Sequence, residues 1–308
     1  MVSFVIGHAL EVLVIHTNDH HGNLFNYIYN DKEVPGLAER AYILKEIIND
    51  NKNYLLLDAG DMNTGQYESR IREAEPDIKS YNMMGYHAVT LGNHEFYAGL
   101  ERLKKQIEWA DFPFLCANIS YNDGTPVGTP YILKQIPNGL KVAIFGLTTP
   151  TLESSMPSLM DKIKIQDEVE VARKLVPELR KQADIVIALT HLGISHTDPS
   201  SLPFPFSLVV EIAAIRLAKQ VTGIDIIIDG HSHTVLEAPV IVNNIPIIQA
   251  GERGRYIGKA ILDFDTNTKK VILKEWECIS LMKPKGYDFK FDNDIRRYLM
   301  NFKTKASE

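Results

Sequence analysis

Short runs of β-branched and aliphatic residues alternate along this 308-residue sequence with longer stretches in which apolar residues recur every three or four positions. The short runs are typical of strands buried on both faces, and the longer stretches are typical of helices with one apolar side. This alternation predicts an α/β fold. Strands are expected at residues 12–16, 54–58, 88–91, 114–118, 142–147, 185–190 and 226–229. Helices are expected at residues 36–49, 76–84, 100–110, 166–182 and 208–221.

The pattern changes after residue 229. Apolar runs at 240–242, 245–249, 257–264 and 271–279 are separated by turn residues such as Asn243-Asn244, which predicts an antiparallel ending. A last amphipathic helix is expected at 292–302, because Ile295, Tyr298, Leu299 and Phe302 share one face.

Charge and composition exclude several classes of protein. The 33 Lys and Arg against 39 Asp and Glu give a net charge of -6, which argues against binding of a nucleic-acid polymer and favours a small substrate. No apolar run reaches the ~18 residues of a membrane span.

The two cysteines, Cys116 and Cys278, lack metal-ligand spacing and are expected to be buried thiols or at most one bridge. The first ten residues lack the Lys or Arg of a signal peptide, so a cytoplasmic location is expected, with an exported protein whose signal peptide has been removed as the alternative.

Polar residues recur at the carboxyl ends of the apolar runs, where an α/β sheet binds its ligands. They are Asn18-Asp19-His20-His21-Gly22, Gly60-Asp61, Gly92-Asn93-His94-Glu95, His191 and Gly230-His231-Ser232-His233. One Asp-x-His group alone is weak evidence, since polar loops after strands are common. Six of the ten histidines gather at these ends with two aspartates and an asparagine, each beside a glycine that permits close approach. The set predicts a metal site.

The type and number of ligands predict two divalent cations. Imidazole and carboxylate groups without thiolates suit Mn, Zn, Fe or Co, with Mg as a further option. If Asp61 bridges, seven residues fill two sites of about four ligands each, with the metals ~3.5 to 4 Å apart. The seven are Asp19, His21, Asp61, Asn93, His191, His231 and His233.

These blocks, in this order, resemble the catalytic domain of the 5'-nucleotidase and UDP-sugar hydrolase group of calcineurin-like metallophosphoesterases. The resemblance runs from about residue 12 to Glu252. It rests on the blocks at 16–22, 60–65, 91–96, 116–118, 146–149, 189–193 and 230–234. It implies a four-layer α-β-β-α sandwich of two mixed sheets.

The resemblance also implies a role for each matching position. Asp19, His21 and His233 would hold the first metal, Asn93, His191 and His231 the second, and Asp61 would bridge. His94 would be the catalytic histidine, stabilising the transferring phosphoryl group and assisting the leaving oxygen. Asn93 and His94 would also contact the substrate. Asn63 would support the site, whereas His20 and His87 are expected to be surface or supporting residues.

Two departures from the family pattern bear on the substrate. The residue three positions after the catalytic histidine is usually Asp in the 5'-nucleotidases, and here it is Tyr97. Family members also carry a C-terminal domain, joined by a helix, whose aromatic side chains bind the nucleobase. We expect residues 1–284 to form the catalytic domain and residues 285–308 to be a helical extension resembling the start of that linker. The substrate would then be recognised mainly through its phosphate, or the chain is a fragment, or a partner subunit completes the pocket.

The expected function is hydrolysis of a phosphomonoester by a 5'-nucleotidase-like enzyme. The alternatives are a 2',3'-cyclic-nucleotide phosphodiesterase with 3'-nucleotidase activity or a nucleotide-sugar hydrolase, and, in another class, a non-catalytic binding module. Retention of all seven ligands argues against the module. The loop at 198–206, with Phe204 and Phe206, is a lesser candidate for a wall of the crevice. Arg253 and Arg255 are lesser candidates for contacts with the phosphate.

Overall fold

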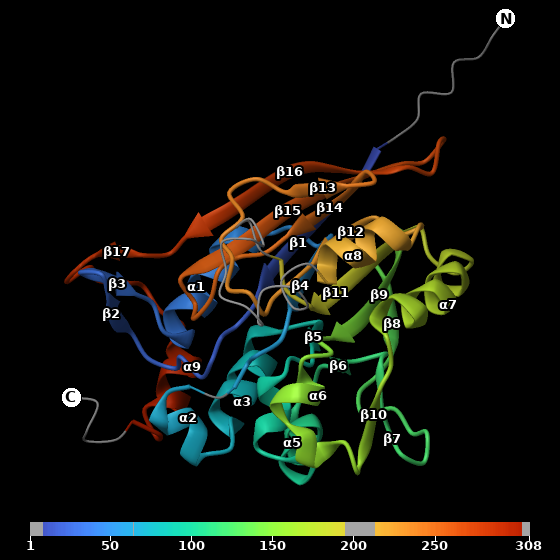
Figure 1. Ribbon diagram of the computed structural model, residues 1–308. Coiled ribbons are helices and arrows are strands. Elements are labelled where there is room, and N and C mark those ends of the chain that lie inside the picture. Colours follow the sequence, from blue (N-terminus) through green and yellow to red (C-terminus); the bar gives the residue numbers. More distant parts are fainter. Residues whose placement is uncertain (1–8, 64, 195–212, 304–308) are drawn as a thin grey trace, which may run out of the picture.

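Two six-stranded mixed sheets form the frame of the computed structural model, which describes residues 9–63, 65–194 and 213–303 (Figure 1). The first sheet has the order β16-β15-β1-β4-β5-β6. Its strands are β1 (Ala9–Thr17), β4 (Tyr54–Asp58), β5 (Ala88–Thr90), β6 (Phe114–Leu115), β15 (Tyr256–Asp265) and β16 (Val271–Ser280). β1, β4, β5 and β6 run parallel, and β15 is antiparallel to β1.

The second sheet has the order β13-β14-β12-β11-β9-β8. Its strands are β8 (Tyr131–Gln135), β9 (Lys141–Thr148), β11 (Ile185–His191), β12 (Ile226–Ile228), β13 (Val240–Val242) and β14 (Ile245–Ile248). The four central strands are parallel, and β8 and β13 are antiparallel edges.

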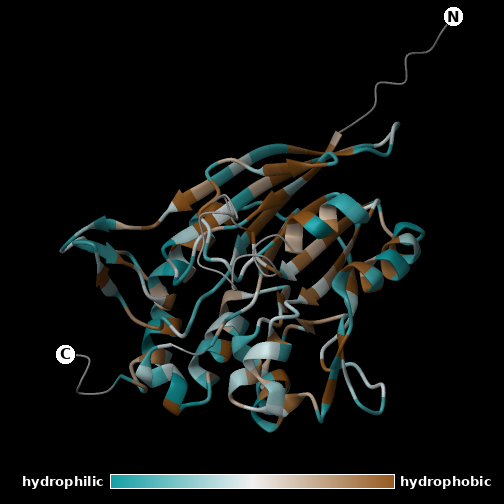
Figure 2. Ribbon diagram, viewed as in Figure 1, coloured by the Kyte–Doolittle hydropathy of each residue, from teal (hydrophilic) through white to brown (hydrophobic). Residues whose placement is uncertain are grey.

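Three apolar cores separate four layers. In β1, Val12 and Val14 face the second sheet, whereas Leu13 and Ile15 face the helices, because successive side chains of a strand point to opposite faces. The helices are α1 (Leu37–Ile48), α3 (Glu75–Met84), α5 (Leu100–Trp109) and α9 (Asn293–Leu299) beside the first sheet, and α7 (Glu168–Arg180) and α8 (Ala213–Gln220) beside the second. Figure 2 shows apolar strands inside and helices with mixed surfaces outside. The predicted α-β-β-α sandwich is confirmed.

Short elements surround this frame. A small sheet joins β2 (Tyr27–Tyr29), β3 (Lys32–Val34) and β17 (Lys283–Pro284), and a second pairs β7 (Ile119–Tyr121) with β10 (Ile163–Ile165). The short helices are α2 (Tyr67–Ile71), α4 (His94–Tyr97), α6 (Leu152–Ser155) and the 3-10 helix η1 (Pro157–Leu159). Asn30 and Asp31, both with positive φ (49° and 56°), form the tight turn between β2 and β3.

The predicted antiparallel ending is correct only in part. β13 and β14 form a hairpin, as do β15 and β16, but β14 also pairs in parallel with β12. Every residue of β14 is buried, so this strand belongs inside the second sheet rather than at its edge. The hairpin β15-β16 instead extends the first sheet beside β1 (Figure 1).

The other predicted elements are confirmed to within a few residues, except where they lie outside the described residues. The start of the helix predicted at 208–221 lies outside the described residues, as does the loop at 198–206 with Phe204 and Phe206.

The predicted C-terminal helix, α9, packs against α1 through buried Ile295 and Leu299. The division of the chain at residue 284 stays a prediction. Both cysteines are free, with Cys116 buried and Cys278 partly buried.

Candidate metal centre

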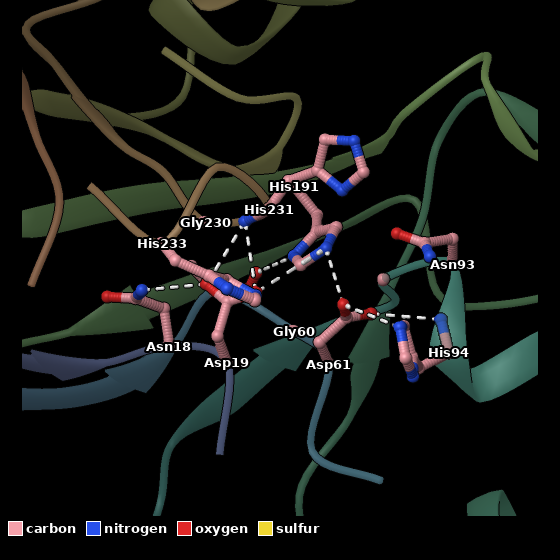
Figure 3. Close-up of polar contacts among 12 residues, drawn as sticks. Asn18, Asp19, Gly60, Asp61, Asn93, His94, His191, Gly230, His231 and His233 are labelled. Atoms are coloured by element: carbon pink, nitrogen blue, oxygen red, sulfur yellow. Dashed lines mark hydrogen bonds and ion pairs between the residues drawn. The ribbon is translucent and has the colours of Figure 1, made fainter. Parts of the chain in front are cut away.

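The predicted ligands converge where the carboxyl ends of both sheets meet. Asp19 follows β1, Asp61 follows β4, Asn93 follows β5, His191 ends β11, and His231 and His233 follow β12. Hydrogen bonds join the sheets at this edge: Thr90 Oγ1 donates to the Leu189 carbonyl at 2.6 Å, and Thr148 Oγ1 to the Leu91 carbonyl at 2.6 Å. In Figure 3, His191 lies between Asp19 and Asp61, with His233 on the Asp19 side and Asn93 and His94 on the Asp61 side.

Five of the seven predicted ligands have a backbone in the left-handed region. The φ angles are 52° at Asp19, 49° at His21, 56° at Asp61, 78° at His231 and 56° at His233. This conformation costs a non-glycine residue about 1 kcal/mol or more and concentrates at functional sites. The surrounding sheets must therefore hold each of these loops in place.

Glycines beside the ligands allow the loops to approach one another. A Cβ on Gly92 would lie 2.2 Å from Asp61 Oδ1, and a Cβ on Gly230 would lie 2.7 Å from the Ala59 carbonyl oxygen and 2.9 Å from His191 Nδ1. All three distances are below van der Waals contact. The structure thus supplies the close approach that the sequence predicted at these glycines.

His191 presents a lone pair to two carboxylates. Its Nδ1 donates to the Ala59 carbonyl at 2.7 Å, so in the neutral ring Nε2 carries no proton. That nitrogen lies 3.2 Å from Asp61 Oδ2 and 3.9 Å from Asp19 Oδ1, without a well-formed hydrogen bond among the described residues. Burial lowers the pKa of His191, but Asp61 and Asp19 outweigh it and raise the pKa to about 10. The two carboxylates therefore favour a positive charge at Nε2, which either a proton or a bound cation supplies.

His233 is arranged in the same way on the other side. Its Nδ1 donates to Glu252 Oε2 at 2.9 Å, which leaves Nε2 3.3 Å from Asp19 Oδ1 and 3.0 Å from His21 Nε2. Burial opposes protonation, but Asp19 and Glu252 raise the pKa of His233 to about 9. A carboxylate that orients a histidine ring in this way is the usual support of a metal ligand.

The remaining histidines of the cluster favour the neutral form. Burial lowers the pKa of both His21 and His231 to about 4, even though Asp61 and Asp19 raise it. Neutral imidazole is the form that binds a metal. Three groups have ligand atoms within 4.8 Å of one another, namely Asp19, His21 and His233, then His21, Asp61 and His94, then Asp61, His191 and His231.

The two aspartates are held by groups that fix their oxygens. Asn18 Nδ2 donates to Asp19 Oδ2 at 2.8 Å, and the backbone N–H of His231 donates to the same oxygen at 3.0 Å. Burial alone would raise the pKa of Asp61, but the charge of the nearby His191 holds that pKa well below its ordinary range. Asp61 is therefore ionised. Both carboxylates are fully or almost fully buried, and cations would compensate their charge.

Tyr97 contacts Asn93 rather than replacing a carboxylate. Asn93 Nδ2 donates to the Tyr97 hydroxyl at 2.7 Å, which turns the amide oxygen into the crevice. That Oδ1 atom is buried and has no hydrogen-bond partner in the described part of the chain. An orphaned amide oxygen beside Asp61 and His191 is the observation expected of a metal ligand.

Glu95 is a supporting residue whose role was not predicted from the sequence. Its carboxylate is buried and accepts the backbone N–H groups of Gly92 at 2.7 Å, Asp61 at 3.0 Å and Asn63 at 3.3 Å. It therefore joins the loops that follow β4 and β5. Burial, with the nearby Asp61, raises the pKa of Glu95 to about 8 against these donors.

His94 lies at the open side of the cluster. Its side chain is 28% exposed, and Nε2 is 3.8 Å from Asp61 Oδ2. Its ring centroid is 4.6 Å from those of both His21 and Tyr97. Burial lowers the pKa of His94 despite the opposing charge of Asp61. Its position allows contact with a ligand that enters from solvent.

The other histidines and arginines considered in the sequence bond to neighbouring protein groups. His20 is buried between Arg40 and Asp77, at 2.9 Å from each, so it is a supporting rather than a surface residue. His87 Nδ1 accepts the Leu56 N–H at 3.0 Å. Arg253 and Arg255 both bond the Glu252 carboxylate, and Arg255 is buried rather than solvated.

Comparison with known proteins places the chain in a family. The Calcineurin-like phosphoesterase profile matches residues 12–235, and the chain belongs to this family. The matching relatives and solved structures are named as phosphoesterases and 5'-nucleotidases, which supports metal-dependent phosphoester hydrolysis over the alternative of a non-catalytic binding module.

The relatives define this likeness further. The chain is 34% identical over 307 residues to the 5'-nucleotidase of Vibrio vulnificus, covering 91% of this chain and 54% of that protein. Among solved structures, calcineurin-like phosphoesterase YfkN from Bacillus subtilis is 26% identical with a TM-score of 0.77, covering 96% of this chain and 97% of that one. A 5'-nucleotidase precursor from Thermus thermophilus is 25% identical with a TM-score of 0.79, covering 95% of this chain and 58% of that one.

The chain spans about half the length of the curated relatives it matches first. No comparison supports the cytoplasmic location expected from the sequence. Within residues 9–63, 65–194 and 213–303, no helix has the length and apolar character needed to cross a bilayer.

Proposed function

We propose that this chain hydrolyses the phosphate monoester of a nucleotide with two divalent cations. The observation that carries the proposal is the pair of histidines, His191 and His233, whose Nδ1 atoms are engaged and whose Nε2 atoms face carboxylates at 3.2 and 3.3 Å. The two Nε2 atoms lie on either side of Asp19 and Asp61, where two bound cations or two protons could supply positive charge. Cations fit better, because protons on the two histidines would leave the buried Asn93 Oδ1 without a partner.

The proposed ligand sets follow from these contacts. Asp19, His21 and His233 would hold one cation, and Asn93, His191 and His231 would hold the other. Asp61 lies within reach of both groups and would be shared between them. The absence of thiolates favours Mn, Zn, Fe or Co, with Mg as a further option.

The mechanism depends on the residues around the cations. When bound, the two cations supply positive charge that neutralises the phosphate oxygens and makes water a nucleophile near neutral pH. His94, at the open side, contacts the transferring phosphoryl group. An incoming phosphate raises the lowered pKa of His94, so that the imidazolium can donate its proton to the leaving oxygen. Tyr97 holds Asn93 in position beside His94.

A nucleotide is the favoured substrate because the relatives named 5'-nucleotidase match over most of this chain. The competing substrates are cyclic nucleotides and nucleotide sugars. Tyr97 keeps the diesterase alternative open, because the position that is usually Asp in 5'-nucleotidases carries a neutral hydroxyl, which bonds Asn93. We also propose residues 1–284 as the catalytic domain and residues 285–308 as the start of a linker.

The test uses p-nitrophenyl phosphate and bis-p-nitrophenyl phosphate with metal-stripped protein, to which Mn, Zn, Co or Mg is added back. Metal-dependent turnover of the monoester, lost in Asp61→Asn, is expected. Faster turnover of the diester would favour the phosphodiesterase alternative. No turnover with any metal would contradict the proposal that this chain alone is a competent enzyme.

A further inference from the structure

A pocket of about 470 Å³ opens beside His233, on the side of its ring that faces Glu252. Ligand pockets usually measure ~300 to 1,000 Å³. Four segments that are distant in the sequence line it: the β2-β3 hairpin, the loop after β12, the loop before β15, and Met282. His233 lines this pocket and also belongs to the proposed metal centre, so the pocket and the centre adjoin at this residue.

The hairpin is fastened to the loop before β15, which makes this wall a built surface. Tyr27 and Tyr29 point to the same face of β2 because side chains alternate along a strand. The Tyr27 hydroxyl donates to the Arg253 carbonyl at 3.0 Å, and the Arg255 guanidinium lies 4.1 Å from the centre of the Tyr29 ring. Lys32 is the direct cross-strand neighbour of Tyr29 and shares its face.

The opposite wall carries a second aromatic ring at close quarters. Tyr256 packs against Gly251, where a Cβ would lie 2.7 Å from the ring. Val235 and Met282 add apolar surface, and the pocket edge carries Asn30 and Lys32. The Tyr29 and Tyr256 rings line the pocket and can contact a flat heterocycle, as aromatic side chains do in nucleotide-recognising proteins, while the buried Arg255 guanidinium packs on the Tyr29 ring.

The charges of the pocket favour the same ligand. Glu252 accepts from His233, Arg253 and Arg255, so its negative charge is compensated within the wall. Lys32 adds a further positive charge at the exposed edge. The pocket therefore offers ring surfaces and hydrogen-bonding groups in a mildly positive environment, as suits the nucleoside portion of an anionic nucleotide.

We propose that this pocket binds the nucleoside moiety of the substrate, with the base stacked against Tyr29 or Tyr256. The catalytic domain then contributes to base recognition through its own residues. The inference rests on the proposed nucleotide substrate. It differs from the expectation that the chain recognises its substrate only through phosphate.

The first experiment measures binding of adenosine and uridine, which lack phosphate, by calorimetry with the whole chain. Wild-type protein is expected to bind at least one nucleoside, and Tyr29→Ala to bind it about tenfold more weakly, as loss of one stacking partner implies. Tyr29→Phe keeps the ring and should restore binding. Tyr287→Ala is the matched control, since Tyr287 is also exposed and does not line the pocket.

The second experiment compares hydrolysis of AMP and p-nitrophenyl phosphate by the same variants. In Tyr29→Ala we expect KM for AMP to rise about tenfold, so that the preference for AMP over p-nitrophenyl phosphate falls by the same factor. No nucleoside binding by wild-type protein, or an equal loss on both esters, would overturn the inference. Absence of turnover on both esters in wild-type protein would instead contradict the proposed function, and nucleoside binding would still test the pocket.

Discussion

His191 and His233 each use Nδ1 to bond a neighbouring oxygen and turn Nε2 toward a carboxylate. The sequence predicted both residues as ligands, because they follow parallel strands whose ends meet. It did not reveal the partners that orient them. Glu252 lies on a different loop from His233, and the Ala59 carbonyl is a backbone atom without a sequence pattern. Such supporting contacts become visible only once the loops are placed together.

The bond between Asn93 and Tyr97 makes a prediction about metal affinity. In Tyr97→Phe the aromatic ring beside His94 is kept, but the hydroxyl that accepts from Asn93 Nδ2 is lost. Loss of a residue that supports a metal ligand typically lowers metal affinity about 10 to 100-fold. We therefore expect the affinity for the cation proposed to bind Asn93 to fall about tenfold. Calorimetric titration with Mn measures this, and Tyr287→Phe is the control. Unchanged affinity would show that Tyr97 does not orient Asn93.

His16 makes a prediction about acid stability. It is fully buried, stacks on Trp276 at 5.6 Å, and burial lowers its pKa from 6.5 to about 3 despite a backbone contact with Thr17. Between these values the unfolded chain binds a proton that the folded chain does not, so stability is lost as the pH falls below 6.5. By about pH 5 the loss from this residue is on the order of 2 kcal/mol.

Urea unfolding of metal-free protein at about pH 7.5 and pH 5 tests this loss. His16→Phe keeps a buried ring without a titrating group, and its free energy of unfolding should fall less between the two pH values. Equal falls for wild type and variant would show that His16 does not contribute.

At the scale of elements, burial on both faces explains why the central strands were predictable. β4, β9 and β11 are continuous apolar runs, and their ends deliver polar residues to one edge. The β2-β3 hairpin was missed because strands of only three residues are too short to show a periodicity, and β3 also carries two charged side chains. The placement of β14 beside β12 was missed because the turn at Asn243-Asn244 predicts only its pairing with β13.

Gly92, in the loop after β5, packs against Asp61 in the loop after β4. Gly92→Ala therefore tests the close approach of these two loops. The added methyl group would lie 2.2 Å from Asp61 Oδ1 and 2.6 Å from the Asp61 nitrogen. Asp61 must then move, and we expect loss of metal binding together with destabilisation of about 1 to 3 kcal/mol.

Gly286→Ala is the control for this variant. Gly286 has open space around it and a φ of 82°, so the change adds strain without a clash. It should cost about 1 kcal/mol and leave metal binding intact. Normal metal affinity in Gly92→Ala, measured by calorimetry, would contradict the role of the close approach.

At the scale of the whole molecule, the centre exists only because two sheets pack face to face. Asp19, Asp61 and Asn93 follow strands of one sheet, and His191, His231 and His233 belong to the other. The core between the sheets, with residues such as Val14 and Ile187, therefore sets the separation of the ligands. Family membership accounts for this architecture, and the shared edge accounts for the site.

The central claim is that the described centre holds two divalent cations. Metal content per chain, measured by elemental analysis after dialysis against Mn or Zn, tests it most directly, with Asp61→Asn prepared in parallel. We predict two ions per wild-type chain and a loss of bound metal in Asp61→Asn, because this residue lies within reach of both groups. A wild-type chain that retains no metal, or the same content in both proteins, would contradict the account.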